Sequence, residues 1–213
     1  MQWGQSQCIY GGNMEQYFTK NPTTEKEIYK FDWNIGSERF YFYTSNSVFS
    51  KNGVDFGSML LIETVIKENK NFNGNILDVG CGYGPIGVVI AKLINKSNVS
   101  MADINERALE LTKMNAHENK VEENVKIINS SSYENISENY DIIVTNPPIR
   151  AGKDVVFSFY EGAYEHLNNG GKLYVVIQKK QGAPSTKDKI LSLFANCEIA
   201  DKKSGYFVFR AIK

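Results

Sequence analysis

The stretch ILDVGCGYGPIG, residues Ile76 to Gly87, joins a short apolar segment to a glycine-rich turn and then to the start of a helix. Glycines lack a Cβ, so the backbone of such a turn can approach a ligand closely. Pro85 suits the first helical position, and the free N–H groups and positive dipole end of that helix would face the ligand. The stretch therefore predicts a buried strand, a tight turn and a helix that together build a pocket for a nucleotide-like cofactor.

The chain around this stretch alternates between two kinds of segment, and such alternation predicts βαβ units and a parallel sheet. Strands are expected at Ile76–Val79, Val99–Asp103, Val125–Asn129, Asp141–Thr145 and Leu173–Gln178. Helices are expected at Met59–Lys67, Pro85–Ile94, Glu106–Asn119, Val155–His166 and Lys187–Phe194. Two closing strands, at Ile199 and Tyr206–Ile212, flank a Lys-Lys-Ser-Gly turn, so the last strand should run antiparallel to its neighbour.

Three parts of the chain are expected from these patterns. Residues 1–13 look like a ragged extension prone to disorder, with Met14 as an alternative start. Residues 14–52 form an N-terminal segment in which aromatic-rich runs flank Asn34-Ile35-Gly36-Ser37, a pattern typical of a β-hairpin packed on the main domain. Residues 53–213 form that domain, because 213 residues suffice for one good core and little more.

Composition narrows the class of protein. The apolar fraction of 42% and the charged fraction of 23% are ordinary for a soluble globular chain. No apolar run approaches the roughly 20 residues of a membrane helix, and the first residues lack the pattern of a signal peptide. Three widely spaced cysteines imply neither a disulfide framework nor a zinc site. We therefore expect a cytoplasmic protein without a metal or a membrane partner, of undetermined oligomeric state.

Charge is balanced over the chain, with 24 basic and 24 acidic residues, which argues against a uniformly basic nucleic-acid binder. Six cations nevertheless follow two of the predicted strands, and loops at these strand ends share one edge of a parallel sheet. They are Arg150, Lys153, Lys179, Lys180, Lys187 and Lys189. This group predicts a local basic rim, although each lysine taken alone is more typical of a solvated loop.

The glycine turn by itself leaves two cofactors open. Gly82, Gly84 and Gly87 fit the dinucleotide fingerprint, and Asp103 follows at about the expected 20 residues, where it would accept hydrogen bonds from ribose hydroxyls. Asp78 would repel a pyrophosphate but could reach the amino group of S-adenosylmethionine, and no downstream feature supplies a hydride-acceptor site. S-adenosylmethionine is therefore favoured, with an NAD-binding oxidoreductase as the alternative.

A second segment, Tyr140 to Pro148, is an apolar strand that ends abruptly in Asn146-Pro147-Pro148. An exocyclic amine on a base is a poor nucleophile because its lone pair is delocalised into the ring. Fixed acceptors aimed at its N–H bonds would free that lone pair without reorganisation, and the Asn146 side-chain oxygen and the Pro147 carbonyl are suitable groups. The two prolines stiffen the turn and remove two backbone donors. In isolation the motif is more typical of a strand-terminating turn.

Together these segments resemble the class I S-adenosylmethionine-dependent methyltransferases, and most closely the small-domain family related to the ribosomal RNA guanine-N2 methyltransferases. The resemblance covers nearly all of the chain from Phe40 onward. It rests on Val48–Lys51, Val54–Ser58, Ile76–Gly87, Asn146–Lys153 (NPPIRAGK) and Val176–Ser185 (VIQKKQGAPS). It implies a doubly wound α/β fold with a mostly parallel seven-stranded sheet in the order 3-2-1-4-5-7-6, whose last strand is antiparallel.

The resemblance also implies the roles of the site residues. The cofactor would contact Asp78, Gly80, Cys81, Gly82, Gly84, Asp103, Ile104, Ser131 and Asn146. Catalysis would involve Asn146, Pro147 and Pro148, and the substrate would contact Phe49, Ile149, Arg150, Lys153 and Lys179. The expected reaction is methylation of guanine N2 in RNA, with ribosomal RNA or a small-subunit particle as the expected partner.

The chain departs from the family pattern at two positions. Ile149 stands where an aromatic residue often stacks on the target base, which makes adenine N6 a less suitable target. Ser130-Ser131-Ser132 stands where an acidic residue commonly contacts adenine of the cofactor, so a hydroxyl would replace that contact. A protein glutamine-amide methyltransferase and an RNA-binding domain with a vestigial cofactor fold are the competing hypotheses.

Overall fold

The structure is a computed structural model that describes residues 28–45 and 53–213. Expectations that fall on other residues, including the extension at 1–13, the start at Met14 and the substrate contact of Phe49, lie outside the described residues.

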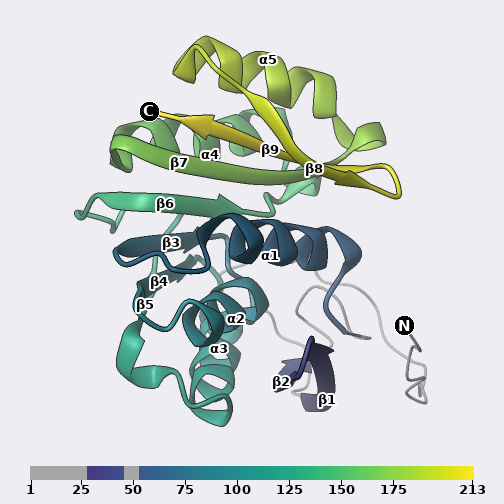
Figure 1. Cartoon of the computed structure of the whole chain (residues 1–213), viewed down its shortest axis with the longest axis vertical. Coiled ribbons are helices and arrows are strands. Elements are labelled where there is room, and N and C mark those ends of the chain that lie inside the picture. The colour runs from purple at the N-terminus through teal and green to yellow at the C-terminus, as the bar shows by residue number, and fades with distance from the viewer. Residues whose placement is uncertain (1–27, 46–52) are drawn as a thin grey trace.

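A seven-stranded sheet in the order β5-β4-β3-β6-β7-β9-β8 runs through the molecule (Figure 1). Its strands are β3 (Asn75–Val79), β4 (Asn98–Asp103), β5 (Val125–Asn129), β6 (Tyr140–Thr145), β7 (Leu167–Gln178), β8 (Glu198–Lys203) and β9 (Tyr206–Ile212). The pairs from β5 to β7 are parallel, whereas β9 is antiparallel to both β7 and β8. The predicted strand order and the antiparallel last strand are both confirmed.

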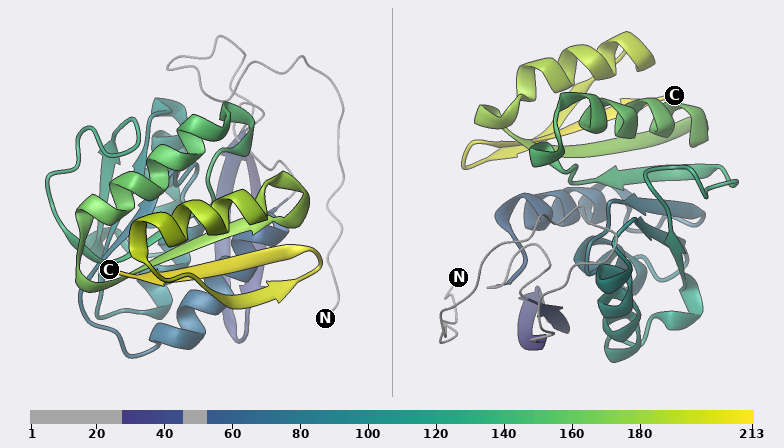
Figure 2. Two further views of the ribbon diagram at one scale, coloured as in Figure 1. Left: turned by 90° about the horizontal axis from the view of Figure 1, so that it is seen from above. Right: turned by 180° about the vertical axis from the view of Figure 1, so that it is seen from behind.

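Helices cover both faces of this sheet (Figures 1 and 2). One face packs against α1 (Phe56–Asn69), α2 (Pro85–Leu93) and α3 (Glu106–Glu118), and the other against α4 (Lys153–His166) and α5 (Ala183–Phe194). Neighbouring residues Ile76 and Leu77 are both fully buried but belong to different hydrophobic clusters, because alternate side chains of a strand point to opposite faces. No helix in the described part of the chain is long and apolar enough to span a bilayer.

The predicted N-terminal hairpin is present as β1 (Ile28–Ile35) and β2 (Glu38–Ser45), which pair antiparallel with Ile35 opposite Glu38. Gly36 takes the positive φ of 59° that the two-residue turn requires. Phe40 and Phe42 are fully buried in the same hydrophobic cluster as α1, α2 and α3. The hairpin therefore lies outside the large sheet, next to α3 (Figure 1).

Four elements begin two or more residues before their expected starts. Helix α1 begins at Phe56 rather than Met59, because the side chain of Asp55 accepts a hydrogen bond from the Ser58 amide and caps the helix. Helix α5 begins at Ala183 rather than Lys187, after Gly182 in a left-handed conformation and with a proline in its first turn. Helix α4 starts two residues earlier than predicted, and β7 extends back to Leu167.

Candidate active site

The glycine turn follows β3 and has the backbone geometry that only glycines adopt freely. Gly80, Gly82 and Gly84 have φ values of 74°, 59° and 85°. A Cβ on Gly84 would lie 2.8 Å from the Thr112 side chain, and one on Gly87 would collide with Met101. Helix α2 starts directly after Gly84, but its first turn offers fewer N–H groups than the sequence suggested: Pro85 has none, the Gly84 amide donates to the Cys81 carbonyl and the Gly87 amide donates to Asp78. The turn is thus a tight cradle at the carboxyl edge of the sheet.

Two buried carboxylates accept hydrogen bonds from the backbone of this cradle and the residues next to it. Asp103, at the end of β4, is 5% exposed and accepts hydrogen bonds from the backbone amides of Gly82 at 2.8 Å and Asn105 at 2.9 Å. Asp78 is fully buried in β3 and accepts one from the Gly87 amide at 2.9 Å. The sequence predicted both acids as cofactor ligands, and the structure adds that each also anchors the loop backbone.

Asp78 is an unusual group because its other oxygen, Oδ1, is buried and accepts no hydrogen bond from the described residues. Burial raises the pKa of this carboxyl to about 7, and the nearby charge of Asp103 adds to the increase. Burial likewise raises the pKa of the neighbouring Cys81 thiol well above its ordinary value. The cradle therefore contains an unpaired buried acceptor, and a ligand with an N–H or O–H donor would satisfy it.

Three polar side chains that sequence reasoning missed support the same loop. Thr112 donates to the Gly82 carbonyl at 2.8 Å, Asn115 to the Tyr83 carbonyl at 2.7 Å, and Thr145 to the Val79 carbonyl at 2.9 Å. All three side chains are fully buried. A signal for the first two existed, because Thr112 and Asn115 are polar residues spaced by three on the apolar face of a predicted helix.

Asn115 also joins the loop to the hairpin. Its amide exchanges two hydrogen bonds with the backbone of Tyr43, at 2.6 and 3.0 Å, and Asn119 does the same with Tyr41 at 3.1 and 2.7 Å. Two asparagines one helical turn apart thus occupy the free edge of β2 as a neighbouring strand would. The conformation of the cofactor loop is therefore linked to the docking of the N-terminal hairpin.

The Asn-Pro-Pro turn lies at the same edge of the sheet. Parallel pairing places Val144 of β6 opposite Asp78 of β3, so Asn146 emerges next to the glycine turn. The Asn146 amide nitrogen lies 3.0 Å from Ser58 Oγ and 3.4 Å from Asp55 Oδ1. The Pro148 carbonyl accepts from Ala151, within the short 3-10 helix η2 (Ile149–Ala151) that also contains Arg150. Of the remaining predicted contacts, Ile104 and Ser131 are half-buried just after β4 and β5, respectively.

The basic rim is only partly as predicted. Arg150, Lys153, Lys179 and Lys180 are exposed at the ends of β6 and β7. Lys187 and Lys189 do not lie in a loop but inside α5, where Lys189 pairs with Glu161 at 2.5 Å. The predicted helix Lys187–Phe194 already contained both lysines, so counting them among the loop cations was wrong. The Lys179 backbone amide donates to the Gly205 carbonyl at 2.7 Å and so brings the exposed Lys202 and Lys203, at the end of β8, close to the rim.

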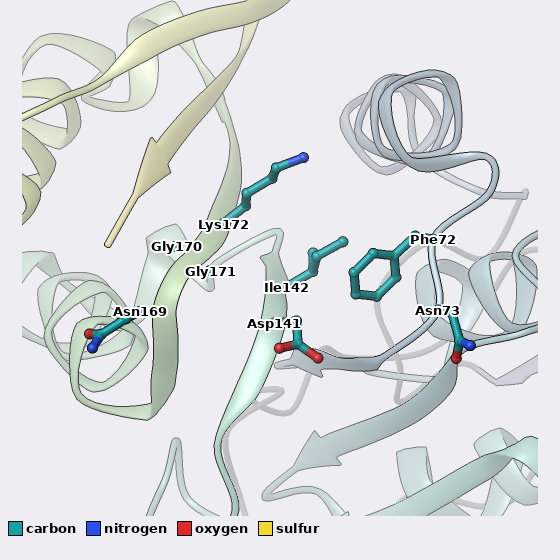
Figure 3. Close-up of a pocket in the computed structure, with 8 residues that line it drawn as sticks. All are labelled: Phe72, Asn73, Asp141, Ile142, Asn169, Gly170, Gly171 and Lys172. Carbon is teal, nitrogen blue, oxygen red and sulfur yellow. The ribbon is translucent and has the colours of Figure 1, made fainter.

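A hollow of about 280 Å³ lies elsewhere, at the amino ends of β6 and β7 (Figure 3). Its lining contains none of the predicted site residues. The Asp141 carboxylate in it serves the fold, because it accepts hydrogen bonds from the Asn75 amide and from Asn168. Cofactors of open α/β sheets bind at the opposite, carboxyl edge, where the cradle and the Asn-Pro-Pro turn meet. Within residues 28–45 and 53–213, no group of three or more His, Cys, Asp or Glu side chains is arranged to bind a metal.

A doubly wound sheet with this strand order, a glycine cradle and an Asn-Pro-Pro turn at one edge defines a class I methyltransferase fold. The chain belongs to the methyltransferase small domain family, whose sequence model matches residues 39–210. This membership confirms the predicted family and the predicted cofactor, S-adenosylmethionine.

Relatives of known sequence support the same family. The uncharacterized protein YbxB of Bacillus subtilis is 43% identical over 201 residues, which cover 93% of this chain and 98% of YbxB. Ribosomal RNA small subunit methyltransferase C of Serratia proteamaculans is 33% identical over 172 residues, or 79% of this chain and 47% of that protein. The enzyme of that name from Escherichia coli K12 is 29% identical over 96% of this chain, which spans 57% of its length.

Among solved structures, the Thermus thermophilus 16S rRNA N2 methyltransferase in complex with AdoMet and guanosine superposes with a TM-score of 0.79. The match has 24% sequence identity and covers 91% of this chain but 52% of that one. At this identity the superposition establishes the fold. The chain thus spans about half the length of the ribosomal RNA methyltransferases that it resembles.

Proposed function

We propose that this protein transfers the methyl group of S-adenosylmethionine to the exocyclic N2 of a guanine in RNA, with ribosomal RNA of the cytoplasm as the substrate. The observation that carries the proposal is the parallel pairing of β3 with β6, which places the Asn-Pro-Pro turn beside the glycine cradle. The relatives named for ribosomal RNA methylation support the choice of substrate.

The cradle fits the cofactor in its donor and acceptor groups. Asp103 would accept hydrogen bonds from the ribose hydroxyls, since each carboxylate oxygen that binds a backbone amide has a further lone pair. The unpaired Asp78 oxygen would accept from a donor of the cofactor, and the turn would approach it closely through Gly80 and Gly82. When bound, S-adenosylmethionine supplies an activated methyl group on a sulfonium, and Ile104 and Ser131 would border its base.

The Asn-Pro-Pro turn would prepare the target nitrogen. The Asn146 side-chain oxygen and the Pro147 carbonyl would accept hydrogen bonds from the two N–H groups of the exocyclic amine. These hydrogen bonds favour a pyramidal nitrogen with an available lone pair. The Pro148 carbonyl accepts a hydrogen bond from the Ala151 amide at 2.9 Å, which helps to fix the turn. The two prolines limit the motion of the turn, so that proximity and alignment supply much of the remaining rate.

The substrate would be bound largely through its phosphates. Arg150, Lys153 and Lys179 are exposed beside the site, and Lys202 and Lys203 extend this cationic surface. Ile149 would pack against a ring face of the target base. Because the reacting amine must leave the base stack, the target nucleotide should lie in a loop or be exposed during ribosome assembly.

The direct test is transfer of labelled methyl groups to RNA and to assembly particles from cells that lack this protein, followed by nucleoside analysis. N2-methylguanosine is the expected product. Asn146→Ala should lower turnover on the order of 100-fold with little change in cofactor affinity, because the lost acceptor acts mainly in the transition state. Label that enters protein glutamine and not RNA would reject the proposed substrate. Near-normal turnover of the variant would show that the Asn-Pro-Pro turn is only structural.

A further inference from the structure

The side-chain amide of Asn146 makes hydrogen bonds to the described residues through its nitrogen only. Its nitrogen Nδ2 lies 3.0 Å from Ser58 Oγ and 3.4 Å from Asp55 Oδ1, and these residues stand 88 and 91 positions earlier in the chain. Its oxygen accepts no hydrogen bond from the described residues. Asp55 and Ser58 both belong to the start of α1, where the Asp55 carboxylate also accepts the Ser58 amide at 3.1 Å.

The chemistry of Asp55 decides which end of the amide faces it. A carboxylate only accepts hydrogen bonds, whereas an asparagine side chain has one accepting and one donating end. Turning the Asn146 amide by about 180° would place its oxygen against the Asp55 carboxylate, where two acceptors would repel each other. The contact with Asp55 therefore selects the orientation in which Nδ2 faces α1 and the oxygen faces away from it.

The start of α1 is itself well fixed. Phe56 packs against Tyr206 of β9 with 5.4 Å between the ring centroids, and a Cβ on Gly57 would lie 3.1 Å from the Tyr206 ring. The positions of Asp55 and Ser58 are thus fixed by the packing of the first turn of α1 against β9. Ser58 is only 3% exposed, so water competes little with its hydroxyl for the Asn146 amide.

We infer that Asp55 and Ser58 are positioning residues: Ser58 holds the Asn146 amide in place, and Asp55 fixes its polarity so that its oxygen is presented to the target amine. This inference rests on the proposed role of Asn146 as an acceptor. Asp55 does not touch the reacting atoms. Its contribution is to remove the alternative orientation, in which Nδ2 would point a donor at the N–H bonds of the amine and the reaction would lose its acceptor.

A charge-swap cycle tests this inference. In Asn146→Asp, two carboxylates face each other, and turnover should fall at least about 100-fold. Adding Asp55→Asn removes one of the two facing charges, and the amide introduced at position 55 can donate to the carboxylate introduced at position 146 when its nitrogen replaces the oxygen that caps the Ser58 amide. The second oxygen of that carboxylate still faces the substrate. The double variant should therefore recover at least about tenfold over Asn146→Asp alone, with the change in kcat rather than in KM.

The single variant Asp55→Asn separates the charge of Asp55 from its accepting oxygen. Asparagine caps helices as well as aspartate does, so α1 should keep its stability and the melting temperature should change little. The oxygen that caps the Ser58 amide is also the one that faces Asn146, so a capping asparagine keeps an acceptor there, the orientation stays selected and kcat should change little. Asp32→Asn is the matched control, since it makes the same charge change in an exposed pair with Arg39, and it should keep wild-type turnover.

A spectroscopic measurement makes the inference independent of the substrate. The Asn146 side-chain N–H signals, assigned by their absence in Asn146→Asp, should exchange slowly with solvent in the wild type and faster in Asp55→Ala. Exchange that is unaffected by Asp55→Ala, or losses that simply add in the swap cycle while Asn146→Ala is inactive, would overturn the positioning role alone. If Asn146→Ala keeps full turnover, the proposed function of the Asn-Pro-Pro turn fails instead. The exchange data would still measure the hydrogen bonds of the Asn146 amide to Asp55 and Ser58.

Discussion

Replacing Asp78 by Asn should change how the stability of the cofactor-free protein depends on pH. Asp78 is fully buried, and one of its oxygens has no partner among the described residues. Burial and the nearby charge of Asp103 raise its pKa from 3.8 to about 7 in the folded state. The unfolded chain would keep an ordinary aspartate, so folding changes the proton affinity of this one group.

The sign follows from the protons bound in each state. Between about pH 4 and pH 7 the unfolded chain has released the Asp78 proton, whereas the folded protein still holds it. Folding takes up a proton in this window, so the free energy of unfolding falls as the pH rises. The slope approaches about 1.4 kcal/mol per pH unit, which amounts to about 3 kcal/mol between pH 5 and pH 8. Below the unfolded pKa and above the folded one, the contribution is constant.

Urea unfolding of wild type and Asp78→Asn at pH 5, 6, 7 and 8 measures this effect as a difference, in which the other titrating groups cancel. The asparagine stays neutral, so the variant should become more stable relative to wild type by about 3 kcal/mol over this range. A buried amide donor at the position of the unpaired oxygen adds a cost of about 1–3 kcal/mol that does not depend on pH. A difference that stays constant within about 1 kcal/mol from pH 5 to pH 8 would refute the argument.

Three other predictions follow from the site. Asp103→Ala should weaken S-adenosylmethionine binding at least about tenfold, measured by calorimetry, because it removes charge-assisted contacts worth about 1.5–3 kcal/mol; unchanged affinity would exclude Asp103 from the pocket. Asn115→Ala should lower the free energy of unfolding by about 2–4 kcal/mol in a urea titration, since it leaves the backbone groups of Tyr43 and Tyr83 without partners; a loss below about 0.5 kcal/mol would contradict this. Lys179→Ala should reduce the slope of log affinity for RNA against log salt by about one unit, and an unchanged slope would place the RNA elsewhere.

Much of the fold followed from short-range patterns. The turn between β3 and α2 could be predicted because its glycines, its proline and the apolar strand before it are consecutive in the chain. The hairpin could be predicted for the same reason, since two aromatic strands flank one tight turn. The strand order came from family resemblance, because alternation alone predicts a parallel sheet without fixing which strands are neighbours.

Helix starts were predicted less well. The sequence placed the start of α1 after Gly57, although Asp55 is a residue type that commonly caps helices. The start of α5 was likewise predicted four residues too late, at Lys187 rather than Ala183. Propensities at a helix end are weak, and the contact that decides the first residue is often made by a side chain outside the apolar pattern.

The sequence by itself determined the residue types of the site: the glycines of the cradle, its two acids and the stiff Asn-Pro-Pro turn. Only the tertiary structure decided what each of them touches. Asp55 meets Asn146 across 91 positions of sequence, and Asn115 meets Tyr43 across 72. Such pairs depend on the register between β3 and β6 and on the packing of α1 and α3 against the sheet. A hydrogen bond requires two atoms at about 3 Å, and for distant residues that distance is set by the assembled core rather than by any local pattern.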